Sequence, residues 1–152
     1  MPGECEFPKH NATSQEIAEI LRGAKTIAVI GASPKRERPA HWISIYLKDH
    51  GYKVIPVNPG QTEILGDPCY NSLSDVPEAI DIVDIFRAPA AVPGIVEEAI
   101  AKKAKVIWMQ EGIVHNEAAD IARAAGLRVV MNKCIYKELA AIAGGHSGPP
   151  LQ

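Results

Sequence analysis

Residues suited to binding a phosphate group are concentrated between positions 31 and 39. Three small residues follow the apolar stretch 27–30 without a gap: Gly31, Ala32 and Ser33. Small side chains let backbone N–H groups approach a ligand closely, and glycine adopts backbone dihedrals that a Cβ forbids. Two cations, Lys35 and Arg38, come next and precede Pro39, a residue favoured in the first turn of a helix. Because a helix N-terminus attracts anions, this stretch predicts a phosphate-binding turn between a buried strand and a helix.

The turn differs from the fingerprint of dinucleotide-binding units. The second and third glycines of the G-x-G-x-x-G pattern are missing after Gly31. Units that bind NAD also end their second strand in Asp or Glu, which receives the ribose hydroxyls. Here the second apolar stretch ends in three uncharged residues: Val57, Asn58 and Pro59. NAD is therefore disfavoured. NADP is disfavoured less strongly, because the basic run Lys35, Arg36 and Arg38 can meet its extra phosphate.

Two further apolar stretches, 80–86 and 106–109, end in residues that can contact a ligand. In an open parallel sheet, ligands bind beyond the carboxyl ends of the strands. The candidates after these stretches are Phe86, Arg87 and Pro89, then Gln110, Glu111 and Gly112. The periodicity of Phe86 also fits a core residue, whereas Arg87 is a binding candidate. Glu111 fits either an acid or base, or a carboxylate that only lies near a helix N-terminus.

Cysteine and histidine residues add no catalytic pattern. Cys134 follows the last apolar stretch on the same predicted edge, where a cysteine is most often a small buried residue. The alternative is a thiol beside a bound thiol ligand, able to form a mixed disulfide. His41 and His115 have no partner at metal-ligand or catalytic spacing. With no Ser/His/Asp set and no paired carboxylates in view, we expect no catalytic residues and no metal site.

Strand and helix patterns alternate along the chain. Strands are predicted over residues 25–30, 53–57, 80–86, 106–109 and 127–131. Helices are predicted over about 14–23, 39–50, 90–103, 116–125 and 135–143, the first preceded by a Thr13–Glu16 capping box. This alternation predicts an α/β fold: a single-domain Rossmann-like parallel sheet with helices on both faces. We expect a flexible lead-in over 1–13, the domain over 14–143 and a disordered tail over 144–152.

Composition excludes several classes of protein. The 152 residues carry a formal net charge of −2, so no global basic field favours nonspecific nucleic-acid binding. No apolar run approaches the roughly 20 residues that span a bilayer, and the first residues lack a signal-peptide pattern. The three cysteines form no C-x-x-C pair, which fits a reducing compartment. We therefore expect a cytoplasmic protein that binds neither nucleic acid nor a membrane.

Several strings, in this order and spacing, resemble those of the stand-alone CoA-binding domain proteins. They are Ile27–Pro34, Arg38–Pro39, Gly51–Pro59, Leu65–Gly66, Tyr70, Val83–Arg87, Val106–Gly112 and Val130–Cys134. The likeness covers roughly residues 14–140. The same domain is similar to the CoA-binding part of succinyl-CoA synthetase α subunits and of acyl-CoA synthetases that form ADP.

The resemblance implies a Rossmann-like domain that binds coenzyme A or acyl-CoA at the carboxyl edge of its sheet. Phosphates would be held by Gly31, Ala32 and Ser33, with Arg38 and Lys35. The adenosine would be lined by Val57, Asn58 and Pro59. The nucleotide or the pantetheine would be flanked by Phe86, Arg87 and Pro89. Synthetase activity depends on a phosphorylated histidine in a second domain, so the resemblance does not extend to that activity.

Three functions remain open from the sequence. The first is non-catalytic binding of CoA, as a carrier, a sensor or the partner subunit of an enzyme. The alternative is an NADP-linked small reductase or another nucleotide-using enzyme, which rests on the generic strand–turn–helix opening and the basic run. The third is a domain that serves protein association, for which a homodimer is one form.

Overall fold

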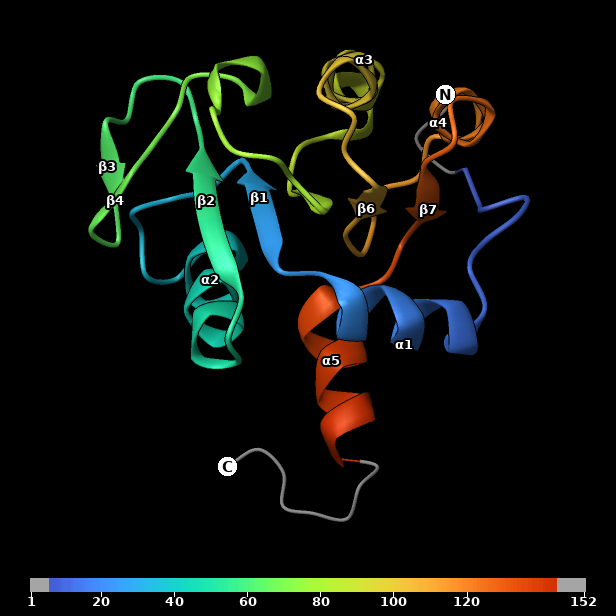
Figure 1. Cartoon of the computed structure of the whole chain (residues 1–152), viewed down its shortest axis with the longest axis horizontal. Helices are drawn as coiled ribbons and strands as arrows, with labels where there is room; N and C mark the ends of the chain where they lie inside the picture. Colours follow the sequence, from blue (N-terminus) through green and yellow to red (C-terminus); the bar gives the residue numbers. More distant parts are fainter. Residues whose placement is uncertain (1–5, 145–152) are drawn as a thin grey trace.

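A sheet of five parallel strands forms the centre of the molecule in the computed structural model, which describes residues 6–144. From one edge to the other its strands are β2 (Lys53–Val57), β1 (Thr26–Ile30), β5 (Ile82–Ile85), β6 (Val106–Met109) and β7 (Arg128–Val130) (Figure 1). The chain adds β2 on one side of β1 and then returns to add β5 on the other. The strand order therefore reverses between β1 and β5, which is where ligands bind in such sheets.

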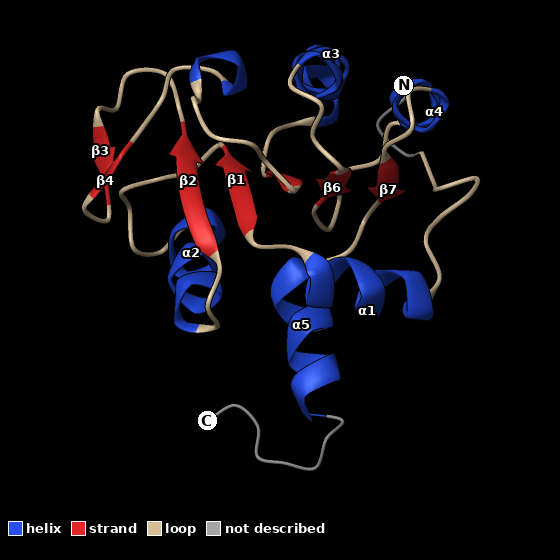
Figure 2. Cartoon of the chain, in the orientation of Figure 1, coloured by secondary structure: helices blue, strands red, loops and turns tan. Residues whose placement is uncertain are grey.

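Helices cover both faces of this sheet, as predicted (Figures 1 and 2). On one face lie α1 (Ser14–Gly23), α2 (Pro39–Asp49) and α5 (Ile135–Gly144). On the other lie α3 (Val92–Ala101) and α4 (Asn116–Ala124). The α/β prediction of a single Rossmann-like domain is thus confirmed.

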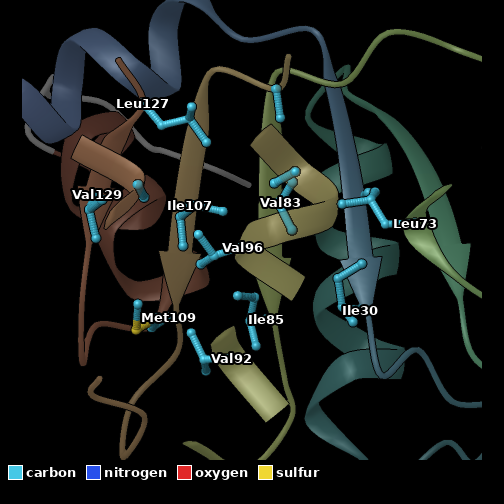
Figure 3. Close-up of a cluster of buried hydrophobic side chains, with 14 of the residues drawn as sticks. Ile30, Leu73, Val83, Ile85, Val92, Val96, Ile107, Met109, Leu127 and Val129 are labelled. Carbon is cyan, nitrogen blue, oxygen red and sulfur yellow. The ribbon is translucent and has the colours of Figure 1, made fainter. Parts of the chain in front are cut away.

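Two buried layers of apolar side chains hold the helices on the sheet. Figure 3 shows the layer beneath α3 and α4, where the strands contribute Ile30, Val83, Ile85, Ile107, Met109 and Val129. Alternate strand residues point to the opposite face and pack under α1, α2 and α5: Ile27, Val29, Ile82, Val106, Trp108 and Val130. Strands that are buried on both faces are apolar without interruption, which explains why these strands could be predicted from the sequence.

The segment before α1 is attached to the domain by hydrogen bonds. The Asn11 side chain accepts from the Met131 N–H and donates to the Met131 carbonyl, both at 2.9 Å, beside the end of β7. Glu6 Oε1 accepts from the N–H of Asn116 at the start of α4. Thr13 and Glu16 form the predicted capping box. Residues 1–5 of the predicted lead-in and 145–152 of the predicted tail lie outside the described residues, and α5 ends at Gly144.

The connection after β2 contains more structure than the sequence indicated. β3 (Glu63–Ile64) pairs with β4 (Asp67–Pro68) in a small antiparallel hairpin, in a segment for which no strand was predicted. Tyr70 then forms a parallel bridge with Val57, at the edge of the main sheet. Short 3-10 helices follow at Leu73–Asp75 and Pro89–Ala91. Within residues 6–144, no helix has the length and apolar character needed to cross a membrane.

Candidate functional site

A cleft of about 780 Å³ opens beyond the carboxyl ends of β1 and β5. Residues from all four predicted strand exits line it: Gly31, Ser33, Lys35, Arg38, Asn58, Pro59, Phe86, Arg87 and Gln110. The fold therefore brings together segments that are up to 79 positions apart, counting from Gly31 to Gln110. The cleft is the place that the strand order marks for a ligand.

Gly31 allows three strand exits to meet at the floor of the cleft. Its φ is +93°, and a Cβ built there would lie 3.1 Å from both the Phe86 carbonyl oxygen and the Arg87 Cδ. Its N–H donates to the Val57 carbonyl oxygen at 2.9 Å, and the Ala32 N–H donates to the same oxygen at 3.3 Å. These two amides are therefore engaged within the protein. Of the three residues in the predicted phosphate turn, Ser33 has the N–H that makes no hydrogen bond to a described residue.

Three cations face the cleft from two separate segments. Lys35 and Arg38 come from the loop before α2, and Arg87 follows β5. Among residues 6–144, none of the three makes an ion pair. Arg38 is the N-cap of α2 and gives it no side-chain cap, so the cleft also receives the open N-terminus of an eleven-residue helix. Cations and a helix N-terminus on one cleft are the features that bind phosphates.

Four predicted residues lie outside the cleft wall: Ala32, Val57, Pro89 and Gly112. Ala32 and Val57 are buried, and the Val57 carbonyl anchors the turn. The N–H of Gly112 donates to Asn132 Oδ1 at 2.7 Å, so it joins two loops. Asn58 Nδ2 donates to the Ala32 carbonyl oxygen. Asn58 stands where an NAD-binding domain has a carboxylate, and its side-chain amide therefore also fixes the turn at residues 31–33.

Several residues of the cleft were missed by sequence reasoning: Trp42, Gln61, Tyr136 and Lys137. Trp42 is 41% exposed, whereas Ile43 and Leu47 of the same helix are buried. Its ring meets that of Tyr136 edge to face, with centroids 5.2 Å apart. The signal was the helical period, because successive residues point about 100° apart and a run of adjacent apolar residues cannot all face the core.

The two histidines support backbone structure. His41 Nδ1 is 2.8 Å from the Ser33 carbonyl oxygen, which ties α2 to the turn. The His115 side chain accepts from the Ala118 N–H and caps α4. Within the described residues, no group of three or more His, Cys, Asp or Glu side chains is arranged to hold a metal ion.

Asp84 is a fully buried carboxyl in the central strand, two residues before Phe86. Its neighbours across the sheet are Val29 and Trp108, both fully buried, and neither of its oxygens has a hydrogen-bond partner. Burial raises the pKa of this carboxyl well above its ordinary value. Burial therefore favours the neutral form of the Asp84 carboxyl.

The model of the CoA binding domain family matches residues 25–140. The chain belongs to this family. Its fold and its cleft are those of a Rossmann-like domain, and the resemblance seen in the sequence is confirmed.

Relatives include stand-alone proteins and parts of ligases. The chain is 41% identical over 125 residues to the uncharacterized protein YneT of Bacillus subtilis, covering 82% of this chain and 93% of YneT. It is 31% identical over 119 residues to the ADP-forming acetate–CoA ligase of Methanocaldococcus jannaschii, covering 73% of this chain but 17% of the ligase. A solved hypothetical protein from Pyrococcus horikoshii OT3 superimposes with a TM-score of 0.82 at 45% identity, covering 90% of this chain and 96% of that one.

Proposed function

We propose that the cleft binds coenzyme A or acyl-CoA, and that the domain performs no turnover of its own. The observation that carries this proposal is the grouping of Lys35, Arg38 and Arg87 around the open N-terminus of α2. CoA carries a pyrophosphate and a third phosphate on its ribose, so several cations on one cleft suit it. Membership of the CoA binding domain family supports the same ligand.

The cleft suggests how the ligand lies. Phosphates would bind at Ser33, Arg38 and Arg87, and the adenosine would lie along Asn58 and Pro59. The remainder of the ligand would extend toward the exits of β6 and β7, where the cleft wall is formed by Gln110, Ile113, Cys134 and Tyr136. A carboxylate at the end of β2, which an NAD site would use, is replaced by Asn58.

Isothermal titration calorimetry with the full chain tests the proposal. CoA should bind saturably, and NADPH, the ligand of the reductase alternative, should neither bind nor compete. The variant R38A should bind CoA roughly 10- to 100-fold more weakly, since a hydrogen bond to a charged group contributes about 1.5–3 kcal/mol.

The matched control is R36A, because Arg36 lies in the same basic run but does not line the cleft. Its affinity for CoA should equal that of the unmodified protein. Equal losses in R36A and R38A would indicate a general charge effect and contradict the assigned site. Binding of NADPH alone would favour the reductase, and binding of neither ligand would favour a role in protein association or as a subunit of a larger enzyme.

A further inference from the structure

The first turn of α5 forms the cleft wall beside the exits of β6 and β7. Cys134 immediately precedes this helix, and its carbonyl accepts from the Glu138 N–H at 3.0 Å. The side chain lines the cleft and is 7% exposed. The position of Cys134 is therefore defined by a regular helix on one side and by the cleft on the other.

Hydrogen bonds between neighbouring strand exits hold this cysteine in place. The Lys133 N–H donates to the Met109 carbonyl at 3.3 Å, and Trp108 Nε1 donates to the Lys133 carbonyl at 2.8 Å. The Ile135 N–H donates to Gln110 Oε1 at 3.1 Å. Cys134 is thus fixed by its neighbours on both sides before any ligand binds.

Gln110 supplies a second and independent feature that points to a ligand. It is 6% exposed, lines the cleft, and its Oε1 is occupied by the Ile135 N–H. The other end of the amide is therefore the Nε2 group, which can only donate hydrogen bonds. Nε2 makes no hydrogen bond to a described residue. A buried amide at a cleft wall, with an NH2 group that no described residue engages, suits a carbonyl oxygen of a ligand.

We infer that Cys134 accepts the acyl group of a bound acyl-CoA, with Gln110 Nε2 donating to the thioester oxygen. This inference rests on the proposed function. The Cys134 sulfur attacks the thioester carbon, a new C–S bond forms, and the C–S bond to CoA breaks. The thiol proton of Cys134 ends on the departing CoA sulfur, so no oxidant or reductant is needed. One thioester replaces another, and the acyl load of the protein therefore follows the ratio of acyl-CoA to free CoA.

Intact-protein mass spectrometry of the full chain tests this inference, using acetyl-CoA as the probe and a phosphine as the reductant. The protein should gain the mass of one acetyl group, mapped to Cys134, removed by hydroxylamine and reversed by excess CoA. C134S should gain none. C69S, in which the other described cysteine is replaced, should load as the unmodified protein does.

Q110E separates the donor from the structural role of Gln110. A glutamate oxygen still accepts from the Ile135 N–H, but the free N–H donor is lost. Loading should slow by roughly 10²-fold, the usual effect of removing one donor to a developing oxyanion. Equal loading rates in Q110E and the unmodified protein would contradict the role of Nε2.

Calorimetry on the same samples distinguishes the two proposals. Acetyl-CoA that binds to the unmodified protein and to C134S without any acetyl transfer would overturn the inference and leave CoA binding intact. An adduct with the mass of a whole CoA, formed with CoA disulfide and never with acetyl-CoA, would replace it with a mixed disulfide. Failure of acetyl-CoA and CoA to bind at all would overturn the proposed function as well.

Discussion

Replacing Asp84 by asparagine should remove a large part of the pH dependence of stability. The ordinary pKa of an Asp carboxyl is 3.8, and burial raises the pKa of Asp84 well above it. Above about pH 4, the unfolded chain therefore ionises this carboxyl while the folded protein keeps it protonated. Unfolding releases a proton in that range, so the free energy of unfolding falls as the pH rises. The fall ends once the pH reaches the pKa of the folded state.

The size of this effect follows from the linkage relation. Each pH unit between the pKa of the unfolded state and the raised pKa of the folded state contributes about 1.4 kcal/mol, which the unmodified protein loses through Asp84 as the pH rises. This is a substantial share of the roughly 5–15 kcal/mol that stabilises a typical domain. The asparagine amide does not titrate in this range, so D84N should lack this contribution.

Urea unfolding followed by circular dichroism, without ligand, measures the difference. The free energy of unfolding of the unmodified protein minus that of D84N should fall as the pH rises above about 4, by up to about 1.4 kcal/mol for each pH unit. D49N, which alters an exposed carboxylate on α2, should follow the unmodified protein at every pH. A difference between the unmodified protein and D84N that stays constant with pH would refute the reasoning, because Asp84 would then be ionised in the folded state.

Two further predictions concern the turn and the first helix. G31A should lower the free energy of unfolding by about 1–3 kcal/mol, because φ is +93° and the new Cβ would press on Phe86 and Arg87. It should also weaken CoA binding through Arg87, whereas G94A, which adds a Cβ in open space within α3, should be neutral or raise the free energy of unfolding by up to about 1 kcal/mol. T13A should cost about 1 kcal/mol in urea unfolding, because it removes the Thr13 hydroxyl that accepts from the Glu16 N–H at 3.1 Å. Equal stability of G31A and G94A, or an unchanged unfolding midpoint in T13A, would contradict the respective argument.

The strands and their exits were predictable because parallel strands buried on both faces are apolar without interruption. Residues 106–109 illustrate this, since all four are buried and the predicted and observed bounds agree. Once the strands were located, the shared edge of a parallel sheet was enough to gather Asn58, Arg87 and Gln110 at one cleft. The hairpin β3–β4 was not predictable in this way, because each of its strands has two residues and no period to read.

Hydrogen bonds between residues far apart in the chain could not be predicted from the sequence. Small residues at 31 and 32 suggested free amides, but the acceptor that engages both amides is Val57, more than 20 positions away. In the same way, Tyr136 and Lys137 belong to the cleft because α5 starts beside the exit of β6. Helical periodicity predicts which face of a helix is buried. It does not predict which strand end lies beside the first turn of that helix.

The part of the cleft with the three cations and the part beside the exits of β6 and β7 are built differently, so substitutions in the two parts should change ligand binding in different ways. The first part contains one continuous loop with Lys35 and Arg38, joined by Arg87. Every CoA species carries the same phosphates, so substitutions there should weaken binding of CoA and acyl-CoA by the same factor. The second part depends on hydrogen bonds between the exits of β6 and β7, centred on Gln110. Substitutions there leave the phosphate contacts unchanged, and they should therefore alter the ratio of the two affinities rather than both together.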